Sequence, residues 1–290
     1  NESQAGSSPA TVVVTVNNVG PVAPTSEQPS GSGTDADPYL IANLNNLYWL
    51  SQTSAEWVSG KVYRQTADID ASTTSLLDGG AGFTPLGVDS SNAFEANYDG
   101  GGHVISGLVI NRPTQSYVGF IGYGKGQIIR NLGLENVDIT GNGKVGGFIG
   151  RANGMTIEKC YSTGTVHGNG DYVGGFIDGI EGSASTISNS YSTCNVTGAG
   201  ALGGFYGNGG GAITNCYSAG SVSGSHMYGG FGAYDNLTVQ NSFWDTETSG
   251  QTTGWNSAAL GVTGKTTSEM KTASTFTNAG RFQSVNEGDT

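Results

Sequence analysis

Short apolar runs separated by Gly, Asn and Ser recur along the middle of the chain. One recurring segment reads Val-Gly-Gly-Phe-Ile-Gly or a close variant. Its phenylalanines follow one another at steps of 28, 28, 29 and 26 residues, as Phe120, Phe148, Phe176, Phe205 and Phe231. About eleven residues after each comes a second motif, typically Asn-Cys-Tyr-Ser or Asn-Ser-Tyr-Ser, and a third β-prone run follows in most repeats. Three short strands in each repeat predict one turn of a three-sided solenoid.

We therefore expect an all-β chain folded as a right-handed parallel β-helix with short helical caps. Equivalent residues of successive turns would stack about 4.8 Å apart along the axis. The phenylalanines would form one aromatic column, and a second would contain Tyr161, Tyr191, Tyr217 and Phe243. An amide ladder at a corner would contain Asn131, Asn189, Asn215 and Asn241, interrupted by Lys159. A propeller blade needs about 40 residues, so this period excludes a propeller.

The sequence divides into four segments. Residues 1–24 hold a β-prone run at 11–16 and a Pro-containing linker, which resemble the end of a bacterial immunoglobulin-like module. Residues 25–97 form an N-terminal capping region, in which Asn43 is placed to cap a short helix. The β-helix repeats occupy 98–250. Residues 251–290 form a C-terminal cap, where Thr266 and Glu269 have the spacing of a capping box for a helix ending near Phe276.

The two repeated motifs resemble the GLUG-motif repeats of large bacterial surface proteins, which include immunoglobulin-A-specific metallopeptidases and adhesin-like chains. The resemblance covers about residues 98–250. It implies a β-helix located outside the cell or on the bacterial cell surface, joined to flanking domains of a larger chain. Such repeats look like stalks, spacers or recognition surfaces, and the resemblance brings no catalytic residues with it.

Composition and charge narrow the set of partners. The chain carries a net charge of −12, with 11 basic and 23 acidic residues. Nucleic-acid binding requires a basic surface, so we exclude it as a function. No apolar run approaches the roughly 18 residues of a membrane-spanning helix, so we also expect no membrane insertion.

Several carboxylates are candidate catalytic groups, because β-helices include polysaccharide lyases and hydrolases. Glycoside hydrolysis usually needs two carboxylates about 5–9.5 Å apart. Asp171, Asp178 and Glu181 are close in sequence, and Asp138 precedes Asp171 by about one turn, but they form no repeated constellation. We therefore expect a non-enzymatic module of a surface adhesin. A polysaccharide-degrading enzyme and a rigid spacer without a ligand are the two alternatives.

One column of residues is a candidate binding surface. The residues that precede the Val-Gly-Gly motifs include Tyr117, Lys144 and Tyr172, and Asp171 stands beside the last of them. If the two tyrosines face outward, their rings could stack on successive sugars, with Lys144 and Asp171 as hydrogen-bond partners. We expect an extended ligand here, a glycan in the first instance and a host or cell-surface protein in the second.

The sequence predicts no catalytic metal and no cofactor. A structural calcium ion is the one metal left open, at Asp35 and Asp37 or at Asp245 and Glu247. The histidines His103, His167 and His226 fall in unrelated columns and predict no zinc site. Cys160 and Cys216 share a column but stand two turns apart, about 10 Å by strand spacing, so with Cys194 they are expected to be free thiols.

Overall fold

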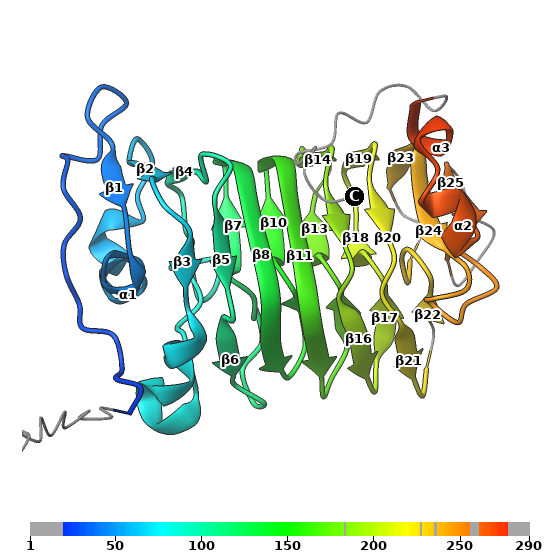
Figure 1. The fold of residues 1–290 in the computed structure, drawn as a ribbon, viewed down its shortest axis with the longest axis horizontal. Coiled ribbons are helices and arrows are strands. Elements are labelled where there is room, and N and C mark those ends of the chain that lie inside the picture. Colours follow the sequence, from blue (N-terminus) through cyan, green and yellow to red (C-terminus); the bar gives the residue numbers. More distant parts are fainter. Residues whose placement is uncertain (1–19, 183, 227, 235–236, 256–260, 278–290) are drawn as a thin grey trace, which may run out of the picture.

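The computed structural model describes residues 20–182, 184–226, 228–234, 237–255 and 261–277. The strand expected at residues 11–16 lies outside this part of the chain. Within it, strands from successive turns lie side by side along one long axis, from β1 at the blue end to β24 and β25 at the orange end (Figure 1). Every strand pair in the described sheets is parallel, which confirms the predicted parallel β-helix.

The described strands form one long sheet and two smaller ones. The long sheet contains β1 (Tyr39–Ile41), β2 (Val62–Gln65), β3 (Ile69–Asp70), β4 (Asn97–Asp99), β5 (Val104–Ser106), β6 (Val109–Asn111), β8 (Ile128–Gly141), β11 (Thr156–Gly168), β14 (Thr186–Ser188), β15 (Tyr191–Ser192), β16 (Asn195–Gly198), β19 (Ala212–Thr214), β20 (Tyr217–Ser218), β21 (Val222–Gly224), β23 (Thr238–Gln240), β24 (Ser242–Asp245) and β25 (Val262–Lys265). The second sheet contains β7 (Ile121–Lys125), β10 (Ile149–Asn153), β13 (Ile177–Glu181) and β18 (Tyr206–Gly209). The third contains β9 (Val145–Gly146), β12 (Tyr172–Gly174), β17 (Ala201–Gly203) and β22 (Tyr228–Gly229).

From β9 to β21, each turn visits the third sheet, then the second, then the long sheet, as in β12, β13 and β14. The register repeats the sequence motifs: Val145 pairs with Val173, and Ile149 pairs with Ile177. Parallel pairing already begins at β1, which pairs with β2, so turns of the stack precede the recognisable repeats.

A column of phenylalanines fills the space between the sheets. The five repeated phenylalanines are all fully buried. Their ring centroids lie 4.8–6.1 Å apart from one turn to the next, and three of the four contacts are stacked. The small residues before each Phe let neighbouring backbones approach: a Cβ on Gly147 would lie 2.2 Å from the carbonyl oxygen of Gly175. The hydrophobic motif therefore specifies the core of each turn.

The predicted amide ladder forms a corner of the long sheet. Asn131, Lys159, Asn189, Asn215 and Asn241 all adopt left-handed backbone conformations, with φ between 49° and 55°. Asn is among the few non-glycine residues that tolerate this region, which explains its recurrence. The amide of Asn215 donates to Asn189 at 3.2 Å, and that of Asn241 donates to Asn215 at 3.3 Å. We call these five positions the asparagine corner.

Helices lie at both ends of the described stack. The helices are α1 (Leu44–Gln52), α2 (Thr267–Met270) and α3 (Ala273–Thr277), with 3-10 turns η1 (Ser54–Glu56) and η2 (Ser72–Gly80). The Asn43 side chain caps α1 by accepting from the Asn46 N–H, as predicted. The Thr266–Glu269 capping box is also present. However, the expected single closing helix is two short ones, because the chain tightens at Lys271, whose N–H bonds the carbonyl oxygens of Thr267 and Glu269.

Candidate ligand-binding face

The predicted column exists at the corner where the third sheet begins. The Tyr117 N–H donates to the Gly143 carbonyl and that of Val118 to the Lys144 carbonyl, which places Tyr117 beside Lys144 on adjacent turns. Tyr172 pairs with Ala201 one turn further on. The side chains of Tyr117, Lys144 and Tyr172 are half-buried. Residue 227, the next member of the column, lies outside the described residues.

Two members of this column hold disfavoured backbone conformations. Tyr117 has φ of 61° and Lys144 has φ of 58°, both in the left-handed region. Unlike Asn, neither has a short polar side chain that compensates locally, so each position costs about 1–2 kcal/mol. Backbone strain of this kind tends to collect at functional sites. We call Tyr117, Lys144 and Tyr172 the tyrosine column.

Contacts within the tyrosine column fix its side chains. The Lys144 ammonium donates to the Tyr117 hydroxyl at 3.0 Å and lies 4.5 Å from the centroid of the same ring. The Tyr117 ring packs edge-on against Tyr123 at 5.5 Å, and the Tyr172 ring packs edge-on against Tyr234 at 5.7 Å. The two tyrosines are thus partly packed on the wall of the stack and keep part of each ring exposed. Asp171 is exposed beside them.

A buried ion pair, which the sequence reasoning did not assign to the site, lies beneath the tyrosine column. Asp178 is fully buried, and its Oδ2 lies 3.3 Å from Nη1 of Arg151. Neither carboxylate oxygen has a hydrogen-bond partner within the described residues. Burial raises the pKa of Asp178 to about 8, against the opposing effects of Arg151 and Lys144. The carboxyl group is therefore held in a costly environment.

Asp178 stands where the neighbouring turns have glycine. The equivalent residues are Gly122, Gly150 and Gly207. This position is crowded, since a Cβ at Gly150 would lie 2.9 Å from the backbone of Val118. The signal was visible in the sequence as Val173-Gly-Gly-Phe-Ile-Asp, the one repeat whose motif ends in an acid.

The Arg151 side chain runs along the axis of the stack. A Cβ added at Gly179 would lie only 2.1 Å from Nη1 of Arg151. The same Nη1 donates to the Asn208 carbonyl oxygen at 3.4 Å. Gly179 pairs with Arg151 and with Asn208 in the register of the second sheet. The absence of a side chain at Gly179 therefore makes room for the guanidinium, and the whole Arg151 side chain is 14% exposed.

A second polar cluster adjoins the column on the second sheet. The Tyr123 hydroxyl donates to Oε2 of Glu181, and the amide of Asn153 lies 3.4 Å from both groups. These residues come from β7, β10 and β13, so the contact crosses three turns. Burial and the Glu181 hydrogen bond raise the pKa of Tyr123.

The candidate catalytic carboxylates Asp138, Asp178 and Glu181 do not share one accessible site. Asp138 lies on β8 of the long sheet and contacts Thr165. Asp178 is fully buried, and Glu181 accepts from Tyr123. A pair acting on a glycoside must reach both sides of the scissile bond. Among the described residues these groups do not offer such a pair.

Asp245, one of the residues at which the sequence leaves a calcium ion open, is hydrogen-bonded to its surroundings. Its Oδ1 accepts from the N–H groups of Glu247 and Thr248 and from the Thr267 hydroxyl, at 2.9–3.0 Å. The last of these bonds connects Asp245 to α2. Over the described part of the chain, no three His, Cys, Asp or Glu side chains gather in a metal-binding group.

The three cysteines are buried free thiols. Burial raises the pKa of Cys160 and Cys216 to about 12 and that of Cys194 to about 11. The two Sγ atoms of Cys160 and Cys216 point to backbone carbonyls of their own turns, at 3.3 and 3.4 Å. These side chains are inward-facing members of a column that alternates with Ser190 and Ser242, whose hydroxyls accept the cysteine N–H groups.

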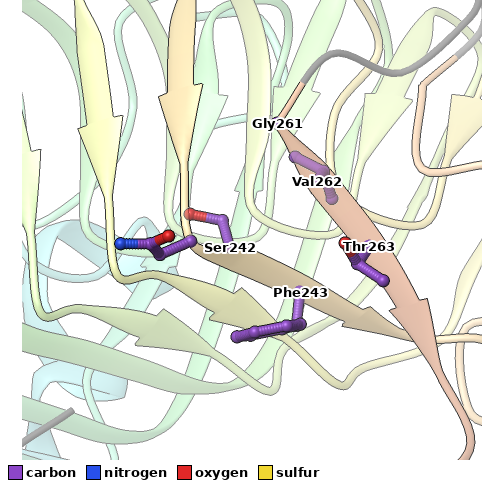
Figure 2. Close-up of a pocket in the computed structure, with 6 residues that line it drawn as sticks. Ser242, Phe243, Gly261, Val262 and Thr263 are labelled. Atoms are coloured by element: carbon purple, nitrogen blue, oxygen red, sulfur yellow. The ribbon is translucent and has the colours of Figure 1, made fainter. Parts of the chain in front are cut away.

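A shallow hollow of about 280 Å³ lies at the far end of the stack, between β24 and β25. Figure 2 shows its lining, with the Phe243 ring on one side and Val262 and Thr263 on the other. It borders residues 256–260, which are outside the described part, and we assign no site to it. None of the helices in the described ranges has the length and apolar character needed to cross a membrane.

Comparisons with known proteins find two sequence relatives and one solved structure with a similar fold. No family model matches the sequence. The chain is 37% identical over 150 residues to “Halomucin” of Haloquadratum walsbyi, which covers 51% of this chain and 2% of that protein. It is 37% identical over 115 residues to a “Putative Gly-rich membrane protein” of Evansella cellulosilytica, which covers 39% of this chain and 13% of that protein. The matched regions thus span only a small part of both relatives.

One solved structure has a similar fold. It is the crystal structure of a “putative immunoglobulin A1 protease” from Bacteroides ovatus, with a TM-score of 0.52 and 20% identity. The similarity covers 83% of this chain and 87% of that chain. At this identity the likeness establishes the fold and transfers no catalytic role.

Proposed function

We propose that this chain is a non-enzymatic, extracellular module of a large surface protein, and that its tyrosine column binds an extended ligand, in the first instance a glycan. The names of the two relatives, “Halomucin” and “Putative Gly-rich membrane protein”, support a place at the cell surface. The small share of each relative that is matched supports a module within a much longer chain.

The observation that carries the proposal is the geometry of the tyrosine column. Tyr117 and Tyr172 stand two turns apart, about 10 Å by strand spacing, with Lys144 between them. Half-buried aromatic rings at this interval suit contact with successive sugars of one extended chain, with polar groups beside them for hydroxyls. Lys144 and Tyr117 are held in place by their mutual contacts. Binding would therefore cost little ordering of side chains.

The strain at Tyr117 and Lys144 gives independent support. Glycine or asparagine would fit their backbone conformation at lower cost, as the asparagine corner demonstrates. Strained backbone positions of this kind collect at functional sites, so the strain is consistent with a binding role for the column.

The test is saturable binding of the chain to a broad glycan array with calcium present. We expect a defined glycan to bind, and Tyr117→Ala and Tyr172→Ala each to weaken binding by about tenfold, or ~1.4 kcal/mol. Tyr48→Ala is the matched control, because Tyr48 lies on α1 at the end of the stack. Normal binding by both column variants would overturn the column as the site. An absence of saturable binding would favour a spacer, and release of shortened glycans would favour an enzyme.

A further inference from the structure

Lys144 differs from the other well-placed cations of this acidic chain. Seven other Lys and Arg side chains lie within 4.0 Å of a carboxylate: Lys61, Arg112, Lys125, Arg130, Arg151, Lys159 and Lys265. Within the described residues the contacts of Lys144 are instead the hydroxyl and ring of Tyr117. Arg64 and Lys271 also have no carboxylate within 4.0 Å among the described residues, but both are exposed, whereas Lys144 is half-buried.

Arg151 is a second positive group on the same turn, and both it and Lys144 act electrostatically on Asp178. Lys144 immediately precedes β9, and Arg151 lies on β10 of the same turn. Over the described ranges, both polar contacts of the guanidinium use Nη1, so the N–H groups of Nε and Nη2 remain to be donated. Arg is suited to paired hydrogen bonds with a carboxylate. Because Asp178 has a raised pKa, its carboxyl group offsets the charge of Arg151 only in part near neutral pH.

We infer that the tyrosine column selects sugars that carry a carboxylate, with Lys144 as the primary anion contact and Arg151 as the second. This inference rests on the proposed glycan binding and specifies its class. The rings of Tyr117 and Tyr172 contact the sugar faces, while the ammonium above Tyr117 is already positioned for a charged substituent. Desolvated charge-assisted hydrogen bonds are stronger than neutral ones, so they would dominate the choice between acidic and neutral sugars.

Asp171 would weaken the binding of the same carboxylate-bearing ligand. It is exposed beside Tyr172, in the column of Gly143, whose Cβ would lie 3.2 Å from the Asp171 N–H nitrogen. A carboxylate on the ligand would be repelled by this side chain. The inference therefore requires opposite effects from neutralising Lys144 and neutralising Asp171, which a general effect on folding would not produce.

The experiment compares three acidic probes with their methyl esters: an oligogalacturonate, an oligomannuronate and sialyllactose. Esterification removes the charge and keeps the sugar rings. We expect at least one acid to bind about tenfold more tightly than its ester in calorimetry at low salt. Lys144→Asn should abolish the preference for the acid over its ester, whereas Asp171→Asn should increase that preference.

Lys159→Asn is the matched control. Lys159 also holds a left-handed conformation, with φ of 54°, but it belongs to the asparagine corner on the long sheet. The same substitution is therefore sterically tolerated at both places, and only the one in the tyrosine column should alter acid preference. Circular dichroism and thermal unfolding of both variants verify that they fold.

Each outcome is decisive. Equal affinity for acid and ester, or an acid preference that survives Lys144→Asn, overturns the inference and leaves glycan binding intact. Failure of all three acids, when a neutral glycan binds on the array, likewise overturns it alone. Failure of every glycan on the array overturns the proposed function as well.

Discussion

Two corners of the stack hold non-glycine residues in the left-handed region, and they differ in how the side chains compensate for the backbone strain. At the asparagine corner, four of the five residues are Asn, and their amides bond to one another or to Asp99. At the tyrosine column, Tyr117 and Lys144 occupy the same conformation without that compensation. The amides of the asparagine corner bond to one another or to Asp99, whereas at the tyrosine column the Lys144 ammonium contacts the ring and hydroxyl of Tyr117 and both side chains are half-buried.

This difference distinguishes residues that stabilise the stack from residues that lie at its surface and are available to a ligand. The asparagine corner repeats from turn to turn, as do the phenylalanines and the stacked tyrosines, whose rings lie 4.7 Å apart. The tyrosine column changes at every turn, and the residue beneath it, Asp178, breaks the glycine pattern. Regular columns lower the free energy of the fold, and local departures from regularity mark where a function is to be sought.

The largest expected effect comes from breaking a regular column. Phe176→Ala removes a fully buried ring stacked 5.0 Å from Phe148 and 4.8 Å from Phe205, and should lower the free energy of unfolding by about 3–5 kcal/mol. Tyr172→Ala, in the same turn, should cost only about 1 kcal/mol because its ring is half-buried against Tyr234. Urea unfolding measures both. Similar losses of stability in the two variants would contradict the distinction between residues that stabilise the stack and residues that lie at its surface.

The second prediction concerns the departure at Asp178. Its pKa of about 8 in the folded chain exceeds the value of about 3.9 for an unfolded aspartate. The folded state therefore binds the extra proton between these values, and stability falls as pH rises through this window. Asp178→Asn cannot ionise and should gain stability relative to the parent chain from pH 5 to pH 8, by at most about 1.4 kcal/mol per pH unit.

Unfolding at pH 5, 6, 7 and 8 tests this directly, because every other titrating group is shared by the two chains. A constant difference in stability across the series would show that Asp178 is ionised throughout, and that Arg151 compensates its burial. Glu181→Gln is the control, since Glu181 is an exposed acid of the same strand.

The repeat positions could be read from the sequence because a solenoid converts period into register. The steps between phenylalanines were enough to align Phe148 with Phe176 and to place Asn189 beside Asn215. The tyrosine column followed from the same alignment. Asp178 did not, because alternation in a strand cannot tell that a residue at a crowded corner has its side chain buried. The contact from Tyr123 to Glu181 depends on side-chain rotamers across three turns, which no local pattern encodes.

The smallest expected effect sharpens the account of the asparagine corner. Asn215 donates to Asn189, accepts from Asn241, and holds φ of 55°. Both Asn215→Ala and Asn215→Gly lose the two amide bonds, but only Ala bears the left-handed strain, so Ala should be less stable than Gly by about 1 kcal/mol. At Ser223, an exposed residue of β21 outside the left-handed region, the order should reverse, since Gly weakens a strand. If Ala were as stable as Gly at 215, backbone conformation would not explain the recurrence of Asn, and the ladder of amide bonds alone would have to account for it.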